Sequence, residues 1–221
     1  KIYKSNVTDP LGRKIVAEWG GIDSKKIAVI EIAKSSGLEL LSEGERNPLI
    51  TSSRGAGKLI NAALDKGYKE IIIGVGGSAT NDGGTGMLSE LGVKFYDSNK
   101  KEIGEGGDAL INLKHIDHSK LDNRIKKTSI VIACDVSNPL CGPKGASVIF
   151  GPQKGATPEM VSKLDKALMH YANIIKKDLG VDIIDYPGSR ASGGLGAAFM
   201  AFFGAKLRLG ADQVLDLLDI D

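Results

Sequence analysis

Residues 70–86 read EIIIGVGGSATNDGGTG, an apolar run followed by a loop rich in glycine and small polar residues. The run predicts a buried strand, and the letters from Gly74 to Ala79 fit the dinucleotide-binding pattern G-x-G-x-x-G/A. In that pattern the third small residue already lies in a helix whose amino end faces a pyrophosphate. A helix from Ala79 would instead carry Gly83, Gly84 and Gly86, and each interior glycine costs roughly 1 kcal/mol relative to alanine. The stretch therefore predicts a strand followed by a long loop.

The loop from Gly76 to Thr85 is expected to hold an anion. Its backbone amides can cradle a negative group, and polar side chains stand ready to contact a ligand. The candidate residues are Gly76, Gly77, Ser78, Thr80, Asn81 and Asp82. The alternative is conformational: the glycines permit a tight turn, and Asp82 stabilises its own loop through backbone amides.

Strands and helices alternate on either side of this loop. Lys1–Val7, Lys14–Trp19 and Ile27–Ile32 have the alternating or apolar patterns of strands. A helix is expected from Ser52 or Ser53 to Gly67, because small and aliphatic residues recur there at helical spacing.

The second half of the chain continues this alternation. Thr128–Cys134 predicts another buried strand, which delivers Asp135 at its carboxyl end. Thr157 and Pro158 begin a long amphipathic helix. Ser192–Gly196 forms a glycine-rich turn into an apolar helix over 197–203, and an amphipathic stretch covers 213–218. The fold class is therefore α/β, with a mixed β-sheet and flanking helices.

Composition narrows the class of function. The chain has 221 residues, is 42% hydrophobic and carries a net charge of +2 with acidic and basic residues well mixed. No basic stripe is present for a nucleic-acid backbone or an anionic membrane surface. No segment has the length of a membrane span or the pattern of a leader, so a cytoplasmic location is expected. Cys134 and Cys141 are interpreted as reduced thiols.

Several separate segments together resemble one known family, the bacterial type I glycerate kinases. The resemblance runs from about Val7 to the last residue, and its longest strings are unusual ones. The segments are Thr8–Gly12, Glu31–Ala33, Ser36–Leu38, Asn47–Leu49, Thr51–Gly57, GVGGSATNDGGTGM from Gly74, Ala133–Asp135, Asn138–Leu140, FGPQKGA from Phe150, and Gly193–Ala197.

The resemblance implies more chain than is present here. The family's proteins are longer, and they consist of a flavodoxin-like domain, formed from both chain ends, with a second α/β domain inserted in the middle. Residues 1–221 resemble that single inserted domain, because the family's opening and closing motifs are absent. The chain is accordingly expected to be a fragment that has little activity alone, and its oligomeric state is left open.

The resemblance also implies a reaction, the transfer of the ATP γ-phosphoryl group to a hydroxyl of D-glycerate with Mg²⁺, which gives 2- or 3-phosphoglycerate. Such chemistry requires positioning, charge neutralisation and a group that accepts the hydroxyl proton. Asp135 is the first choice for proton acceptor or Mg²⁺ ligand, and Asp82 competes for both roles. Asp135 could equally cap the turn that follows it.

Four further residues complete the candidate site. Arg54 could pair with a carboxylate or phosphate, although a surface arginine is the more common role. Lys154 could neutralise phosphate charge, or could be a solvated turn residue. Gly193 and Gly194 precede an apolar helix and could bind an anion at its amino end, but close packing explains them equally well.

Two other functions compete with the kinase. One is a non-catalytic domain that binds small hydroxy acids through the glycine-rich loop. The other is an NAD-dependent oxidoreductase, which Asp97 favours because it stands where a ribose-binding acid is expected. The glycines after Ala79 count against it.

Overall fold

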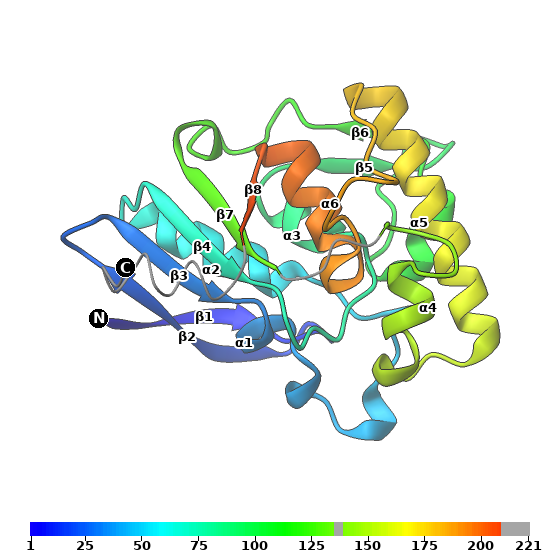
Figure 1. Ribbon diagram of the computed structural model, residues 1–221, viewed down its shortest axis with the longest axis horizontal. Coiled ribbons are helices and arrows are strands. Elements are labelled where there is room, and N and C mark those ends of the chain that lie inside the picture. The colour runs from blue at the N-terminus through cyan, green and yellow to red at the C-terminus, as the bar shows by residue number, and fades with distance from the viewer. Residues whose placement is uncertain (135–138, 209–221) are drawn as a thin grey trace.

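A six-stranded mixed sheet forms the centre of the molecule, here a computed structural model that describes residues 1–134 and 139–208 (Figure 1). Its strands are β1 (Ile2–Thr8), β2 (Lys14–Ile22), β3 (Ile27–Glu31), β4 (Glu70–Gly74), β7 (Ser129–Ala133) and β8 (Lys206–Arg208). The strand order is β1-β2-β3-β4-β7-β8. The first three strands pair antiparallel, and the pairs from β3 to β8 are parallel. The expected α/β fold with a mixed sheet is confirmed.

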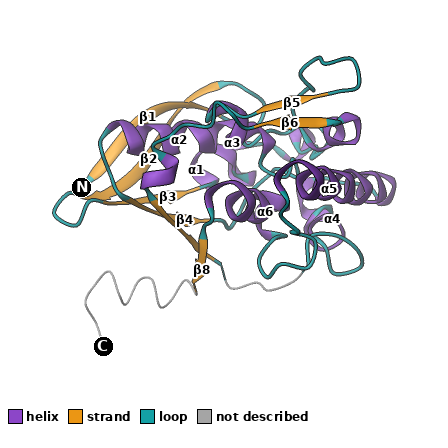
Figure 2. Cartoon of the chain, turned by 90° about the horizontal axis from the view of Figure 1, so that it is seen from above, coloured by secondary structure: helices purple, strands orange, loops and turns teal. Residues whose placement is uncertain are grey.

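Helices and a small second sheet pack with this six-stranded sheet. The helices are α1 (Ala33–Ser36), α2 (Arg54–Asp65), α3 (Thr85–Glu90), α4 (Ala146–Phe150), α5 (Pro158–Leu179) and α6 (Ala191–Phe203), and the second sheet pairs β5 (Lys94–Tyr96) with β6 (His115–Asp117). Short 3₁₀ turns include η3 (Gly107–Asn112) and η5 (Pro152–Lys154). Both views place α5 at the end of the molecule away from the β1–β2 hairpin (Figures 1 and 2). None of the described helices combines the length and the apolar character that crossing a membrane requires.

β4 lies at the middle of the parallel part of the sheet. Ile71, Ile72 and Ile73 are buried, and their neighbours across the strand pairs are the apolar residues of β3 and β7. A parallel strand covered on both faces requires such a continuous apolar run. The predicted strand at Glu70–Gly74 is therefore confirmed, together with those expected near residues 1–7, 14–19, 27–32 and 128–134.

The antiparallel end of the sheet is held by an aromatic cluster. The rings of Tyr3 and Trp19 stack with centroids 4.7 Å apart, and Tyr68 packs edge-on against both. Trp19 Nε1 donates a hydrogen bond to Ser5 Oγ at 2.9 Å, so its buried polar atom is satisfied. Trp19 and Tyr68 belong to the same hydrophobic core as the helices at the other end of the molecule.

Two helix boundaries follow from local chemistry. Thr157 caps α5, since its side chain accepts a hydrogen bond from the Met160 amide, as predicted from sequence. α6 opens through Ser192, Gly193 and Gly194, all three with positive φ, so a turn precedes the regular helix as expected. β8 was not expected, and the amphipathic stretch over 213–218 lies outside the described residues.

Candidate functional site

The loop between β4 and α3 stands at the carboxyl end of a central parallel strand. No helix begins between the end of β4 at Gly74 and Thr85, so the helix geometry of a dinucleotide site is not formed there. Gly77, Gly83 and Gly84 adopt positive φ values of 70°, 61° and 78°. Only glycine takes up such angles readily, and the long loop predicted from the sequence is confirmed.

The loop is fixed by backbone contacts with distant segments. The Leu38 amide donates to the Gly77 carbonyl at 2.9 Å, and the Ala79 amide donates to the Ser36 carbonyl at 2.8 Å. Thr51 Oγ1 donates to the Ala79 carbonyl at 2.8 Å. A loop that is ordered by such contacts holds a ligand-binding surface in place before the ligand arrives.

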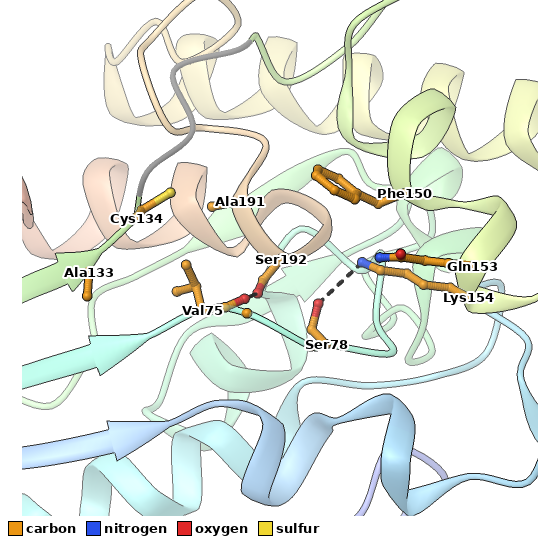
Figure 3. A pocket seen from close by; sticks show the side chains of 11 residues that line it. Val75, Ser78, Ala133, Cys134, Phe150, Gln153, Lys154, Ala191 and Ser192 are labelled. Carbon is orange, nitrogen blue, oxygen red and sulfur yellow. Dashed lines mark hydrogen bonds between the residues drawn. The ribbon is translucent and has the colours of Figure 1, made fainter. Parts of the chain in front are cut away.

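A cavity of about 250 Å³ opens beside this loop (Figure 3). Its walls come from the ends of β4 and β7, from α4, from η5 and from the turn that opens α6. The lining residues are Val75, Gly76, Gly77, Ser78, Ala133, Cys134, Phe150, Gln153, Lys154, Ala191 and Ser192. Ligands of open α/β sheets bind outside the carboxyl ends of the strands, so this cavity is the candidate site.

Lys154 is the cationic group of the cavity wall. It is 2% exposed, and its Nζ donates to the Thr80 carbonyl at 2.6 Å and to Ser78 Oγ at 3.3 Å. Burial lowers the pKa of Lys154 to about 7, while the negative charge of Asp82 acts in the opposite direction. The amine therefore changes its charge near neutral pH, which an exposed lysine does not do. The interpretation of Lys154 as a solvated turn residue is wrong.

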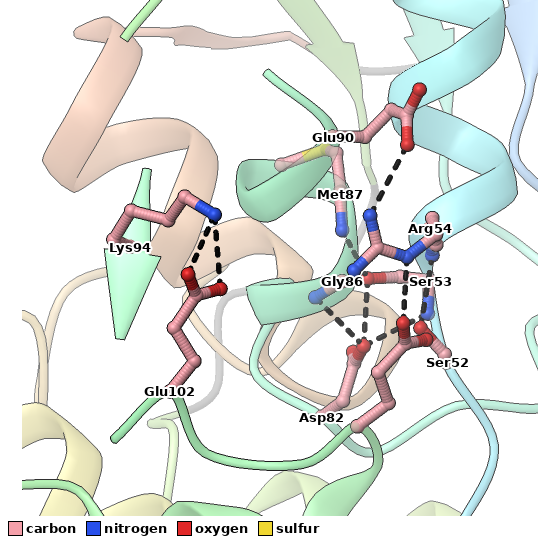
Figure 4. A network of polar contacts seen from close by, with 10 residues as sticks. Ser52, Ser53, Arg54, Asp82, Gly86, Met87, Glu90, Lys94 and Glu102 are labelled. Carbon is pink, nitrogen blue, oxygen red and sulfur yellow. Dashed lines mark hydrogen bonds and ion pairs between the residues drawn. The ribbon is translucent and has the colours of Figure 1, made fainter. Parts of the chain in front are cut away.

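Asp82 is fully buried and is not among the residues that line the cavity. Its carboxylate accepts hydrogen bonds from the Ser53 amide and Ser53 Oγ, both at 2.8 Å, and from the amides of Gly84 at 3.1 Å and Gly86 at 3.3 Å (Figure 4). Burial raises the pKa of Asp82, and these donors oppose the rise. This geometry favours the role of stabilising the loop and the start of α2.

Arg54 also lies away from the cavity lining. Its guanidinium pairs with Glu105 at 2.6 Å and with Glu90 at 3.2 Å, so α2 is tied to the segment after β5 and to α3 (Figure 4). Both partners are carboxylates of the same chain. A ligand carboxylate or phosphate would have to displace them, which makes Arg54 a weaker candidate than Lys154.

Thr80, Asn81, Gly193 and Gly194 are buried and are not among the residues that line the cavity. Asn81 Nδ2 donates to Ser147 Oγ at 3.0 Å, while Thr80 Oγ1 finds no partner among the described residues. A Cβ added at Gly193 would collide with the Thr80 carbonyl, and one at Gly194 would lie 2.9 Å from Gly83 Cα. The close backbone approach favours the packing role of Gly193 and Gly194 over anion binding.

The metal-binding prediction has no support from the described part of the chain. Within residues 1–134 and 139–208, no group of three or more His, Cys, Asp or Glu side chains could hold a metal ion. Asp135, the first choice for base or Mg²⁺ ligand, lies outside the described residues.

Sequence reasoning named Gly193 and Gly194 of the α6 turn but missed Ala191 and Ser192, the residues of this turn that line the cavity. Ser192 has φ 51° and its Oγ donates to the Val75 carbonyl. A non-glycine residue with positive φ is uncommon and persists where tertiary contacts such as this one hold it. The pattern Ser-Gly-Gly before an apolar helix signalled a special turn, but nothing in it indicated that the turn meets the β4 loop.

Comparison with known proteins gives one consistent result. The model of the glycerate kinase family matches residues 1–221. The glycerate 2-kinase of Escherichia coli (strain K12) is 54% identical over 215 residues, which are 97% of this chain and 56% of that protein. The glycerate kinase of Haemophilus influenzae is 50% identical over 220 residues, 100% of this chain and 58% of that protein.

A solved structure agrees with these relatives. The crystal structure of a protein from Salmonella typhimurium LT2, assigned as glycerate kinase 2, superposes with a TM-score of 0.97 at 50% identity. The match covers 99% of this chain and 59% of that one. The chain thus spans somewhat more than half the length of the relatives it matches.

Proposed function

Because this chain belongs to the glycerate kinase family, we propose that it supplies part of the site at which the ATP γ-phosphoryl group is transferred to a hydroxyl of D-glycerate. The supporting observation is the cavity beside the β4 loop, in which the glycine-rich backbone and the amine of Lys154 come together. Amides and an ammonium group suit the carboxylate of an acid substrate or the oxygens of a phosphoryl group.

We propose that Gly76, Gly77 and Ser78 contact the substrate and that Lys154 contributes positive charge when it is protonated. No hydrogen bond among the described residues engages the amides of Gly76 or Gly77, so both can serve a ligand. Thr80 and Asn81 position this surface from behind, as do Gly193 and Gly194. Ser78 also offers a hydroxyl that donates and accepts.

Asp135 remains the proposed proton acceptor, because it directly follows Cys134, which lines the cavity. Magnesium normally accompanies ATP and would neutralise charge on its phosphates. The described residues offer no acidic ligand set for this ion, so no step is assigned to it.

This chain is shorter than the relatives it matches, and the difference affects the activity that we expect of the isolated chain. We propose that residues 1–221 form the inserted α/β domain of a longer kinase and that a flavodoxin-like domain completes the site. The isolated chain is then expected to bind one substrate and to turn over poorly, because under this proposal the second domain supplies the other positioning groups.

Calorimetric titration of the 221-residue chain tests this proposal, with D-glycerate first and magnesium–ATP second. We expect D-glycerate binding that Ser78→Ala weakens about tenfold or more, the effect of one hydrogen bond to a charged group. Ser89→Ala, on α3 and outside the cavity lining, is the control and should bind as the parent chain does.

Each outcome has a meaning. If the chain binds D-glycerate but the longer protein does not phosphorylate it, the result would favour the alternative function, a non-catalytic domain that binds small hydroxy acids. If Ser78→Ala and the parent chain bind D-glycerate with equal affinity, the cavity is not the substrate-binding site. Binding of a nicotinamide cofactor would revive the oxidoreductase.

A further inference from the structure

Ser78 and Lys154 form a hydroxyl–amine pair in the wall of the cavity (Figure 3). Ser78 belongs to the loop after β4, and Lys154 is the last residue of η5, 76 positions further along the chain. Their side chains point toward one another with Oγ and Nζ 3.3 Å apart. Both residues are buried, so bulk water does not compete strongly for this contact.

The second partner of the amine fixes its orientation. Lys154 Nζ donates a hydrogen bond to the Thr80 carbonyl at 2.6 Å, and a carbonyl oxygen can only accept. When the amine is neutral, its lone pair is free to accept a proton from Ser78 Oγ. This is the arrangement of a nucleophilic hydroxyl beside a general base.

The surroundings shift the Lys154 amine toward its neutral form. Asp82 is the charged group that acts on Lys154, and Cys134 is the other titratable side chain in the cavity lining. Burial outweighs the effect of Asp82 and brings the pKa of Lys154 to about 7. A base poised near the working pH is the most effective one.

We propose that Ser78 is a nucleophile activated by Lys154, able to attack an activated acyl ester that enters the cavity. Ser78 Oγ forms a bond to the carbonyl carbon, and its proton passes to Lys154 Nζ. The bond from that carbon to the leaving oxygen breaks, and the leaving group departs as an alkoxide or aryl oxide that takes up the proton from Lys154 or solvent. The product is an O-acyl serine, and no oxidant or reductant is required.

The amides of Gly76 and Gly77 suit the charge that develops in this step. Both residues line the cavity next to Ser78, and no described hydrogen bond engages their N–H groups. Unpaired backbone amides beside a nucleophile can stabilise the oxyanion of a tetrahedral intermediate. This proposal does not depend on the kinase proposal, since an acyl ester rather than a nucleotide is the reactant.

Incubation of the chain with p-nitrophenyl acetate tests the proposal. We expect a burst of p-nitrophenolate and an acetyl group on Ser78, located by peptide mass spectrometry. Ser78→Ala should abolish the burst, and Lys154→Arg should slow it about a hundredfold, since arginine keeps the cation but cannot act as a base. Lys166→Arg, at an exposed position of α5, is the matched control and should react like the parent chain.

The pH profile of the parent chain supplies a measurement that no folding defect of a variant can affect. The rate of acetylation should rise with pH through about 7 and then level off as Lys154 loses its proton. A rate that rises without a plateau would overturn the proposal. So would an acetyl group on Lys154 itself or on Cys134 with Ser78 unmodified, because the amine or the thiol would then be the nucleophile.

Discussion

At the scale of single residues, a fully buried lysine carries a cost that depends on pH. The amine of Lys154 donates hydrogen bonds to two acceptors, which compensate only in part for the hydration that the ammonium group loses on burial. In the unfolded chain its pKa returns to about 10.4. The unfolded state therefore binds more protons between about pH 7 and pH 10, and this group makes stability rise with pH across that interval.

Lys154→Met should show this dependence directly. Below pH 7 both states of the parent chain hold the proton, and the full cost of burying the charge is present. We compare the free energies of unfolding of the variant and the parent chain, measured with urea. The variant's value minus the parent's should be about 2–3 kcal/mol larger at pH 6 than at pH 9. Lys166→Met, at an exposed position, should show no such difference.

Asp82 illustrates a buried charge that is compensated by hydrogen bonds. We expect Asp82→Ala to destabilise the chain by about 3–5 kcal/mol, because the donors of Ser53, Gly84 and Gly86 lose their acceptor in the interior. Asp108→Ala removes a half-buried carboxylate paired with Lys163 and should cost about 1 kcal/mol or less. Equal effects in chemical unfolding would contradict this role of Asp82.

Residue types indicated the chemistry of the site better than its geometry. The glycine-rich loop was predictable because a dense cluster of glycines disfavours both helix and strand. Lys154 became a candidate through its place in the family string, and only the structure shows that it is buried. Sequence patterns do not reveal burial of a lysine in a turn, since burial depends on contacts with Ser78 and Thr80 far along the chain.

At the scale of elements, the turn that opens α6 joins two parts of the site. Gly193 accepts a hydrogen bond from the Gly83 amide at 3.1 Å, and its α-carbon lies where no side chain fits. This backbone contact, together with the hydrogen bond from Ser192 Oγ to the Val75 carbonyl, places the helix against the β4 loop. Close approach of two backbones is a role that only glycine can fill.

Gly193→Ala should therefore cost more stability than Gly204→Ala. Both glycines have similar positive φ, 66° and 60°, so the backbone strain of about 1–2 kcal/mol is common to them. An added Cβ at Gly204 meets nothing within 4 Å, whereas one at Gly193 collides with the loop. The difference between the melting temperatures of the two variants measures the effect of the collision with the loop. Equal melting temperatures would show that the loop moves to accommodate the methyl group without loss of stability.

The elements that the sequence predicted are those with strong local signals. β4 is an uninterrupted apolar run, and α5 has a cap, a proline at its first turn and an amphipathic stripe. β8 has three residues, Lys-Leu-Arg, and owes its existence to pairing with β7. Such a strand has no pattern of its own, because tertiary pairing rather than propensity forms it.

At the scale of the whole molecule, one hydrophobic core joins the antiparallel end of the sheet to the helical end. It contains Trp19 and Tyr68 at one end and Tyr171 and Phe199 at the other. The fold class was predictable, since alternation of strands and helices restricts a chain to few architectures. The antiparallel direction of β2 and β3 beside a parallel set was not, because local patterns do not encode strand order.

This shared core predicts a single cooperative unfolding transition. Trp19 is the only tryptophan, so its fluorescence reports on the sheet, whereas far-ultraviolet circular dichroism reports mainly on the helices. The two signals should change over the same denaturant range. A tryptophan transition at lower denaturant would mean that the antiparallel end unfolds independently.

The β4 loop depends on partners that lie late in the chain. Lys154 and Ser192 reach back to it across 76 and 117 positions. During synthesis on a ribosome, the loop emerges long before either partner, and its polar backbone must stay hydrated until they arrive. The apolar strand that precedes it is exposed for the same interval. Translation speed between these segments thus sets how long the nascent chain is vulnerable to aggregation.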